Sequence, residues 1–194
     1  MYLNCQCNQD LHIHTIFSQS DSAVVKEQTP ELIASIKHAK IIGISDHFEH
    51  MYYNDTLTEY LHILEKYNFR KGIEIDGHEY VEEAIKFDFE YFIYHCWDIS
   101  EDYEALNILL KTGKPVIIAH PYATGTNLNK VPDKCLIEIN NRYIYRYDWK
   151  NFFSPYLEKF QFILSSDAHQ PNWLNQTVAK YVARELNIKE TLLF

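Results

Sequence analysis

Short apolar runs alternate along the chain with longer segments in which apolar residues recur every three or four positions. The short runs have the length and composition of buried β-strands, and the longer segments are typical of amphipathic helices. Strands are predicted over residues 8–14, 40–45, 70–75, 89–94, 115–119, 135–139 and 160–164. Helices are predicted over residues 30–40, 56–67, 79–86, 100–113 and 173–186.

The order of these elements predicts a parallel sheet, because strands that alternate with helices are joined by crossovers. Thr29 and Pro30 fit the N-cap and the first position of the first helix. Residues 121–132 are rich in turn formers and are predicted to be a loop, and residues 142–159 form an aromatic, irregular segment. His50 falls between predicted elements, three residues after His47, and is expected in a loop, with a supporting position beside the metal ligands as the alternative.

A histidine or a carboxylate lies at or near the C-terminal end of every predicted strand. In a closed parallel α/β barrel these ends meet at one mouth, where such folds place their chemistry, whereas an open sheet gathers them only along a line. We therefore predict an α/β fold, a compact seven-stranded TIM-like (β/α)7 barrel. The residues at the strand ends are His12, His14, His47, Glu74, His95, His120, Glu138, Asp167 and His169.

The spacing of the first and last of these residues supports a metal site. His12 and His14 are two positions apart, as are Asp167 and His169, so each pair can share one side of an extended chain but not one face of a helix. A single histidine at a strand end is more often an ordinary core residue. Histidines at several strand ends, together with carboxylates, favour metal ligands, whereas His38, His62 and His78 are predicted to lie outside the site, the first two of them within helices.

Length and composition fit one soluble domain over residues 1–194. The apolar fraction is 46% and the charged fraction 23%, as in globular proteins. No apolar run reaches the roughly 18 residues of a membrane span, and the N-terminus lacks the pattern of a signal peptide, so a cytoplasmic protein with no membrane partner is expected. Cys5, Cys7, Cys96 and Cys135 are unevenly spaced, which favours reduced thiols, with metal binding by Cys5 and Cys7 as the alternative.

The net charge of −9 argues against nucleic acid as the main partner, because no basic stripe is present to follow a phosphate backbone. A cluster of divalent cations would offset part of this charge locally. A short oligonucleotide that reaches a metal site stays compatible with the sequence.

Five short motifs, in this order, resemble those of the polymerase and histidinol phosphatase (PHP) domain family. The resemblance covers residues 8 to about 170, and it implies a distorted seven-stranded β/α barrel with two or three divalent metal ions, zinc, iron or manganese. The motifs are Asp10-Leu11-His12-Ile13-His14-Thr15, Ile44-Ser45-Asp46-His47, Gly72-Ile73-Glu74, Ala119-His120-Pro121 and Ser166-Asp167-Ala168-His169.

The resemblance also implies how the ligands are shared. The first metal would be held by His12, His14, Glu74 and Asp167. Glu74 would bridge to a second metal, which His95 and His120 complete, and a third would lie between His47 and His169. The usual further ligand of the third metal is missing from the loop after the first motif, where Asp21 or Ser20 is the candidate.

Arg142 resembles an arginine that grips substrate phosphate in some members of that family, with a surface arginine as the alternative. Asp46 and Ser166 are predicted to accept the second N–H of ligand histidines. Trp97 and Tyr122 are candidates to line the pocket.

The predicted function is metal-dependent hydrolysis of phosphate esters, most simply small phosphomonoesters, by an activated water, and the predicted partner is a small phosphorylated substrate. Two metal ions roughly 3.5–4 Å apart suit this chemistry. Glu74, Asp167 and His169 are the candidate catalytic residues, and the leaving oxygen would take its proton from water at the third metal, from His169 or from Asp21. Two alternatives stay open, a phosphodiesterase or exonuclease acting on nucleotides or oligonucleotides, and a non-catalytic module stabilised by metal.

Overall fold

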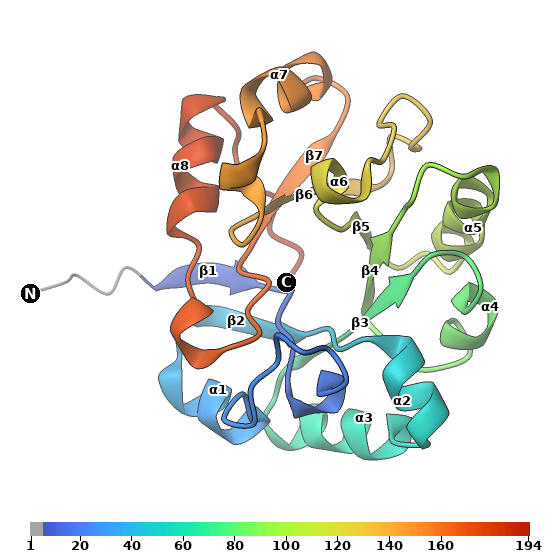
Figure 1. Ribbon diagram of the computed structural model, residues 1–194, viewed down its shortest axis with the longest axis vertical. Coiled ribbons are helices and arrows are strands. Elements are labelled where there is room, and N and C mark those ends of the chain that lie inside the picture. The colour runs from blue at the N-terminus through green and yellow to red at the C-terminus, as the bar shows by residue number, and fades with distance from the viewer. Residues whose placement is uncertain (1–5) are drawn as a thin grey trace, which may run out of the picture.

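The computed structural model describes residues 6–194, and within them seven strands form one sheet in sequence order, β1 to β7. Every neighbouring pair is parallel, and the sheet curls into a nearly closed barrel with the helices outside (Figure 1). The predicted (β/α)7 barrel is thereby confirmed. The strands are β1 Cys7–Asp10, β2 Ala39–Ile44, β3 Arg70–Asp76, β4 Tyr91–His95, β5 Val116–Ile118, β6 Leu136–Asn140 and β7 Gln161–Ser165.

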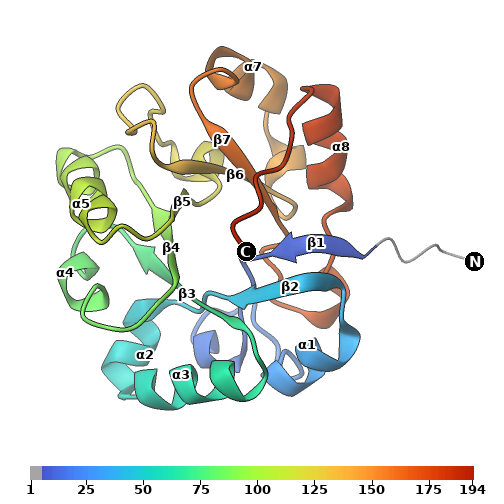
Figure 2. The same ribbon diagram turned by 180° about the vertical axis from the view of Figure 1, so that it is seen from behind.

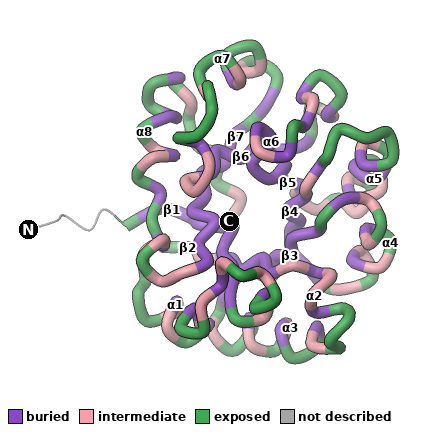
Figure 3. Tube along the Cα trace, in the orientation of Figure 1, coloured by how far each residue is buried: buried purple, intermediate pink, exposed green. Residues whose placement is uncertain are grey.

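Helices connect the strands and pack their apolar faces on the outer side of the sheet, so that the buried residues follow the strands (Figure 3). Thr29 caps the first helix as predicted, because its side chain accepts the amide of Leu32. The predicted irregular segment contains only short helical turns. The helices are α1 Pro30–Ile36, α2 Phe48–Asn54, α3 Leu57–Lys66, α4 Val81–Ala84, α5 Ser100–Lys111, α6 Pro121–Thr124, α7 Trp149–Phe153 and α8 Thr177–Glu185.

Within residues 6–194, three short helices lie where the sequence predicts none: α7, in the segment predicted to be irregular, α2 and α6. Helix α2 has seven residues and carries His50, so the prediction of a loop there is wrong, and α6 is a single turn in the predicted loop after His120. Helices this short have little stability of their own. Helix α2 persists because Phe48 and Met51 are completely buried against the barrel, which a local pattern does not reveal.

Several predicted ends also shift. The first helix stops at Ile36 because Lys37 adopts a left-handed conformation (φ 52°) and Ala39 already pairs with β1. The last helix begins at Thr177, after a 3-10 turn over residues 171–173.

The first strand is shorter than predicted, since it ends at Asp10 and not at His14. Beyond Asp10 the chain continues between the ends of β2 and β7 and closes the barrel. The amide of Asp167 donates to the carbonyl of His12 (2.9 Å), and the amide of His14 donates to the carbonyl of Ala168 (3.0 Å). On the other side the amide of Ser45 donates to the carbonyl of Ile13 (3.0 Å). Both histidines therefore lie in the segment that joins the two edges of the sheet.

The last residues of the described chain close the opposite end of the barrel, at the start of the strands (Figure 2). Glu190 forms a parallel bridge with Phe162, and Leu193 and Phe194 pack on the interior apolar cluster. The ring of Phe194 lies 6.0 Å from that of Tyr91. The barrel is therefore filled by side chains at this end, and its polar end is the other one. The interior cluster consists of Leu11, Tyr91, Ile93, Ile117, Ala119, Leu136 and Ile163.

Two strand glycines make room for Tyr91, which is fully buried and donates its hydroxyl to the carbonyl of Leu11 (2.7 Å). A Cβ atom at Gly72 or at Gly43 would overlap the Tyr91 phenol. We expect Gly72→Ala to lower the free energy of unfolding by about 3 kcal/mol, because the ring has no free space to move into. Urea unfolding measures this loss.

Gly113→Ala is the matched control, since nothing lies within 4 Å of a Cβ there and the cost is only that of its positive φ (74°). That cost is about 1 kcal/mol. Equal losses in the two variants would contradict the packing argument.

Cys7, Cys96 and Cys135 are buried free thiols. Cys5, and with it the alternative of a Cys5–Cys7 metal pair, lies outside the described residues. Among residues 6–194 we find no helix with the length and apolar character needed to cross a membrane.

Candidate metal centre

The side chains that face the barrel interior change from apolar to polar towards the C-terminal ends of the strands. Glu74 follows the inward-facing Gly72 by two positions, and His95 follows the inward-facing Ile93 in the same way. Residues two apart on a strand face the same side. The side chains of these two residues therefore extend the interior column into the mouth.

The strand-end histidines and Glu74 meet there in three groups, each of which could hold a metal ion. In every group one donor atom from each residue lies within 4.8 Å of the others. Two groups share Glu74, and two share His14, so the three sites are contiguous. The groups are His12, His14 and Glu74; Glu74, His95 and His120; and His14, His47 and His169. This division is close to the one that the resemblance implies.

The Glu74 carboxylate lies at the centre and is almost completely buried. Its Oε1 lies 2.6 Å from His95 Nε2 and 3.0 Å from His12 Nε2. Its Oε2 lies 3.1 Å from His47 Nδ1 and 3.2 Å from His14 Nε2. The carboxylate thus contacts imidazoles from all three groups, and two of these groups contain Glu74 itself. A carboxylate that bridges two metal ions occupies a shared position of this kind.

Asp167 completes the wall of the same space. Its Oδ1 lies 3.4 Å from His14 Nε2, while Oδ2 accepts a hydrogen bond from the Asn140 side chain (2.9 Å). Both Asp167 (φ 51°) and His120 (φ 22°) have positive φ angles. Non-glycine residues rarely adopt this conformation, and it concentrates at functional sites.

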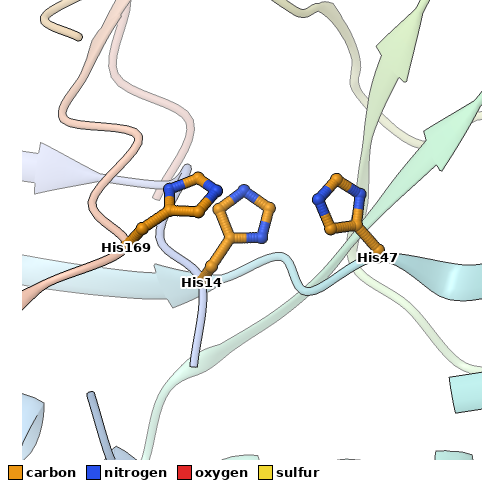
Figure 4. Close-up of side chains that lie close together, drawn as sticks. All are labelled: His14, His47 and His169. Carbon is orange, nitrogen blue, oxygen red and sulfur yellow. The ribbon is translucent and has the colours of Figure 1, made fainter. Parts of the chain in front are cut away.

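The third group lies at the edge of the mouth, with the ring of His14 between those of His47 and His169 (Figure 4). The ring centroids are 4.6 Å and 4.1 Å from that of His14. The candidate Asp21 joins this group, because its Oδ2 lies 2.9 Å from His169 Nε2 and 3.8 Å from His47 Nε2. The other candidate, Ser20, is exposed to solvent.

The donor set fits divalent metal ions. Glu74 Oε1 and Asp167 Oδ1 are buried and have no hydrogen-bond donor, since their contacts with imidazoles do not have hydrogen-bond geometry. His12 Nε2 lies 3.1 Å from His14 Nε2, and His95 Nε2 lies 3.1 Å from His120 Nε2. Converging lone pairs of nitrogen and carboxylate oxygen suit zinc, iron and manganese.

Charge coupling within the cluster sets its proton content in the absence of metal. Burial disfavours the charged form of every group here, but the surrounding imidazoles outweigh it at Glu74 and hold the pKa of that carboxyl well below its usual range. In return, Glu74 raises the pKa of His14 to about 9 and that of His95 to about 10, again against burial. Burial and the neighbouring His95 lower the pKa of His120 to about 4. A metal ion must therefore displace protons to bind.

The predicted partners of the ligand histidines are wrong. Asp46 accepts the amide and the hydroxyl of Thr15, both at 2.7 Å, and contacts no imidazole through a hydrogen bond. The Ser166 hydroxyl donates to the backbone carbonyl of His12. Both residues therefore tie together the backbone segments that carry the histidines, and neither orients a ring.

Glu138 and Asp76 orient the rings instead. Glu138 Oε1 lies 2.7 Å from His12 Nδ1, and its Oε2 accepts the amide of His120 (2.6 Å). Asp76 Oδ1 lies 3.3 Å from His95 Nδ1. The sequence could have predicted that both side chains face the barrel interior, since each residue follows an inward-facing strand residue by two positions.

The remaining histidines lie outside the three groups. His38 bonds Asp10 (2.9 Å), and His78 bonds Asp102 (2.9 Å). His50 lies on α2 with its ring 4.9 Å from that of His47, at the border of the third group.

The cluster opens into a hollow of about 270 Å³. Arg142 lies on its wall, with Nη1 3.0 Å from His169 Nε2 and 3.7 Å from Asp167 Oδ1. Trp97 lines the hollow as predicted, but Tyr122 does not, because it is buried and its hydroxyl accepts the amide of Asn140. A second hollow, of about 360 Å³, lies at the other end of β2 and β3 and contains none of the clustered histidines.

Comparison of the chain with models of known protein families and with curated proteins yields no match. The resemblance to the PHP family thus stays a prediction, based on the five motifs.

Proposed function

We propose that this protein is a PHP-like, metal-dependent phosphoesterase that hydrolyses small phosphomonoesters. The observation that carries the proposal is the position of Glu74, whose buried carboxylate belongs to two of the three ligand groups and lies within 3.2 Å of four imidazoles. A bridging carboxylate of this kind is suited to a two-metal site for in-line displacement at phosphorus.

The three groups, with Asp167 and Asp21, would hold two or three ions of zinc, iron or manganese. When bound, such ions neutralise charge on the phosphoryl oxygens and lower the pKa of water. Glu138 and Asp76 keep the imidazoles in the orientation that ligation needs, and orienting partners of this kind strengthen metal binding.

The residues around the cluster supply the remaining functions. Arg142 presents its guanidinium to the hollow and can bind phosphoryl oxygens through two parallel N–H groups. The His169–Asp21 pair, 2.9 Å apart, can give a proton to the leaving oxygen when the third metal is absent. The size of the hollow and the absence of a basic track favour a small monoester over a polymeric diester.

The first test is phosphate release by manganese-loaded protein from an aryl phosphomonoester, beside release of the aryl alcohol from the matching diester. We expect turnover of the monoester, with the diester at least about tenfold slower, because the diester lacks the second anionic oxygen that the cations would bind. Turnover of the diester alone would favour the phosphodiesterase alternative. Turnover of neither would contradict the proposal.

A further inference from the structure

The mouth of the metal centre has two features that hydrolysis of a simple phosphate does not need. Aromatic side chains line the hollow beside the cluster, and so does a second arginine, Arg146, which lies four positions after Arg142 at the end of a 3-10 turn. Both features concern the part of the substrate that remains after phosphate leaves.

The aromatic rings stand on two sides of the imidazole pair formed by His95 and His120. The ring of Trp97 lies 6.0 Å from that of His95, and the ring of Tyr143 lies 5.0 Å from that of His120. Tyr147 also lines the hollow and is 40% exposed. If the phosphate of a substrate is bound at the cluster, the rest of the molecule therefore extends between aromatic side chains.

Trp97 is held in place at the surface and is not simply exposed there. Its side chain is 49% accessible, yet its indole N–H donates to Asp76 (2.5 Å) and its backbone amide donates to the buried Asp102 (2.6 Å). Two carboxylates thus hold this large apolar side chain at the surface, away from the hydrophobic core. A fixed, open aromatic face is suited to stacking against a flat ligand.

Arg146 is the arginine without a carboxylate partner in the described chain. Arg70 pairs with Glu90, Arg184 lies near Glu185, and Arg142 lies 3.7 Å from Asp167, whereas Arg146 has no carboxylate oxygen within 4 Å among residues 6–194. Its guanidinium lies 5.4 Å from the centre of the Tyr143 ring. In a chain with a net charge of −9, an unpaired arginine at the mouth favours an anionic ligand.

We propose that the substrate is a small phosphomonoester whose organic part is a flat aromatic ring with an anionic group of its own. The ring would stack between Trp97 and the Tyr143–Tyr147 side, and Arg146 would pair with the second anion. This inference rests on the proposed phosphoesterase activity and specifies its substrate class.

The test uses three esters of unactivated primary alcohols whose acidities differ little: 2-phenylethyl phosphate, 2-cyclohexylethyl phosphate and 2-(4-carboxyphenyl)ethyl phosphate. With manganese-loaded protein we expect kcat/KM for the phenyl ester to exceed that for the cyclohexyl ester by about tenfold, through stacking. The carboxylate should add about another tenfold, through its pair with Arg146. Calorimetric binding of the corresponding phosphonates, which are not hydrolysed, should follow the same order.

Matched variants assign each preference to its residue. Trp97→Leu should reduce the ratio of phenyl to cyclohexyl ester to about twofold or less, whereas Tyr181→Leu, at an exposed aromatic on α8, should keep it. Arg146→Gln should abolish the advantage of the carboxylate, and Arg184→Gln should keep it. These comparisons are ratios within one variant, so a general loss of activity does not affect them.

The outcomes separate the two proposals. Equal kcat/KM and equal phosphonate affinity for all three ligands would overturn the substrate class and leave the phosphoesterase intact. No phosphate release from any monoester would overturn the proposed function and this inference with it. Preferences that survive in Trp97→Leu and Arg146→Gln would also overturn the inference.

Discussion

Glu74→Ala is expected to lower phosphate release by about a thousandfold or more, since the change removes the carboxylate that two of the three ligand groups share and leaves the reacting phosphate without its paired cations. The same variant should bind fewer metal ions, because both groups that contain Glu74 lose a ligand. Steady-state turnover and the metal content after dialysis measure the two effects.

Glu79→Ala is the control, since Glu79 is exposed and lies outside the three groups. It should keep turnover within about twofold of the unmodified protein, as a surface substitution away from such features does. Circular dichroism confirms that both variants are folded. Full turnover and full metal content in Glu74→Ala would contradict the assigned role of the carboxylate.

The stability of the metal-free protein is expected to depend on pH in the opposite way to that of manganese-loaded protein. In the metal-free protein the pKa of His14 is raised to about 9 and that of His95 to about 10, against burial, by Glu74. Groups whose pKa is higher in the folded than in the unfolded chain stabilise the fold fully below their unfolded pKa, about 6.5. This stabilisation is lost progressively as pH rises from about 6.5 through 9 to 10, and the loss is expected to be several kcal/mol.

The metal-loaded protein should behave in the opposite way between pH 5 and 8, because protons compete with the metal for the imidazoles. Urea unfolding at several pH values, with manganese or with a chelator, gives both profiles. His95→Gln should flatten the metal-free profile, whereas His62→Gln, on α3 and outside the three groups, should not. A metal-free protein whose stability does not fall above pH 6.5 would refute this account of the cluster.

The local pattern was informative wherever a buried element is long. The apolar runs placed the seven strands to within a few residues, and Thr29 with Pro30 placed the start of α1. It failed at α2, because seven residues contribute too little local signal, and at the end of β1, because residues 12–14 take their hydrogen bonds from β2 and β7 and not from near neighbours.

For the site, too, part of the arrangement follows from the sequence and part only from the tertiary structure. The sequence by itself determined that histidines and carboxylates stand at the strand ends, and a parallel barrel brings such ends to one mouth. Only the tertiary structure decided which atoms face one another. Glu138 Oε1 lies beside His12 Nδ1, Asp21 meets His169 across 148 positions, and Arg146 has no carboxylate oxygen within 4 Å among residues 6–194. Spacing along a strand fixes the side to which a residue points, whereas its partners depend on side-chain packing between segments far apart in the chain.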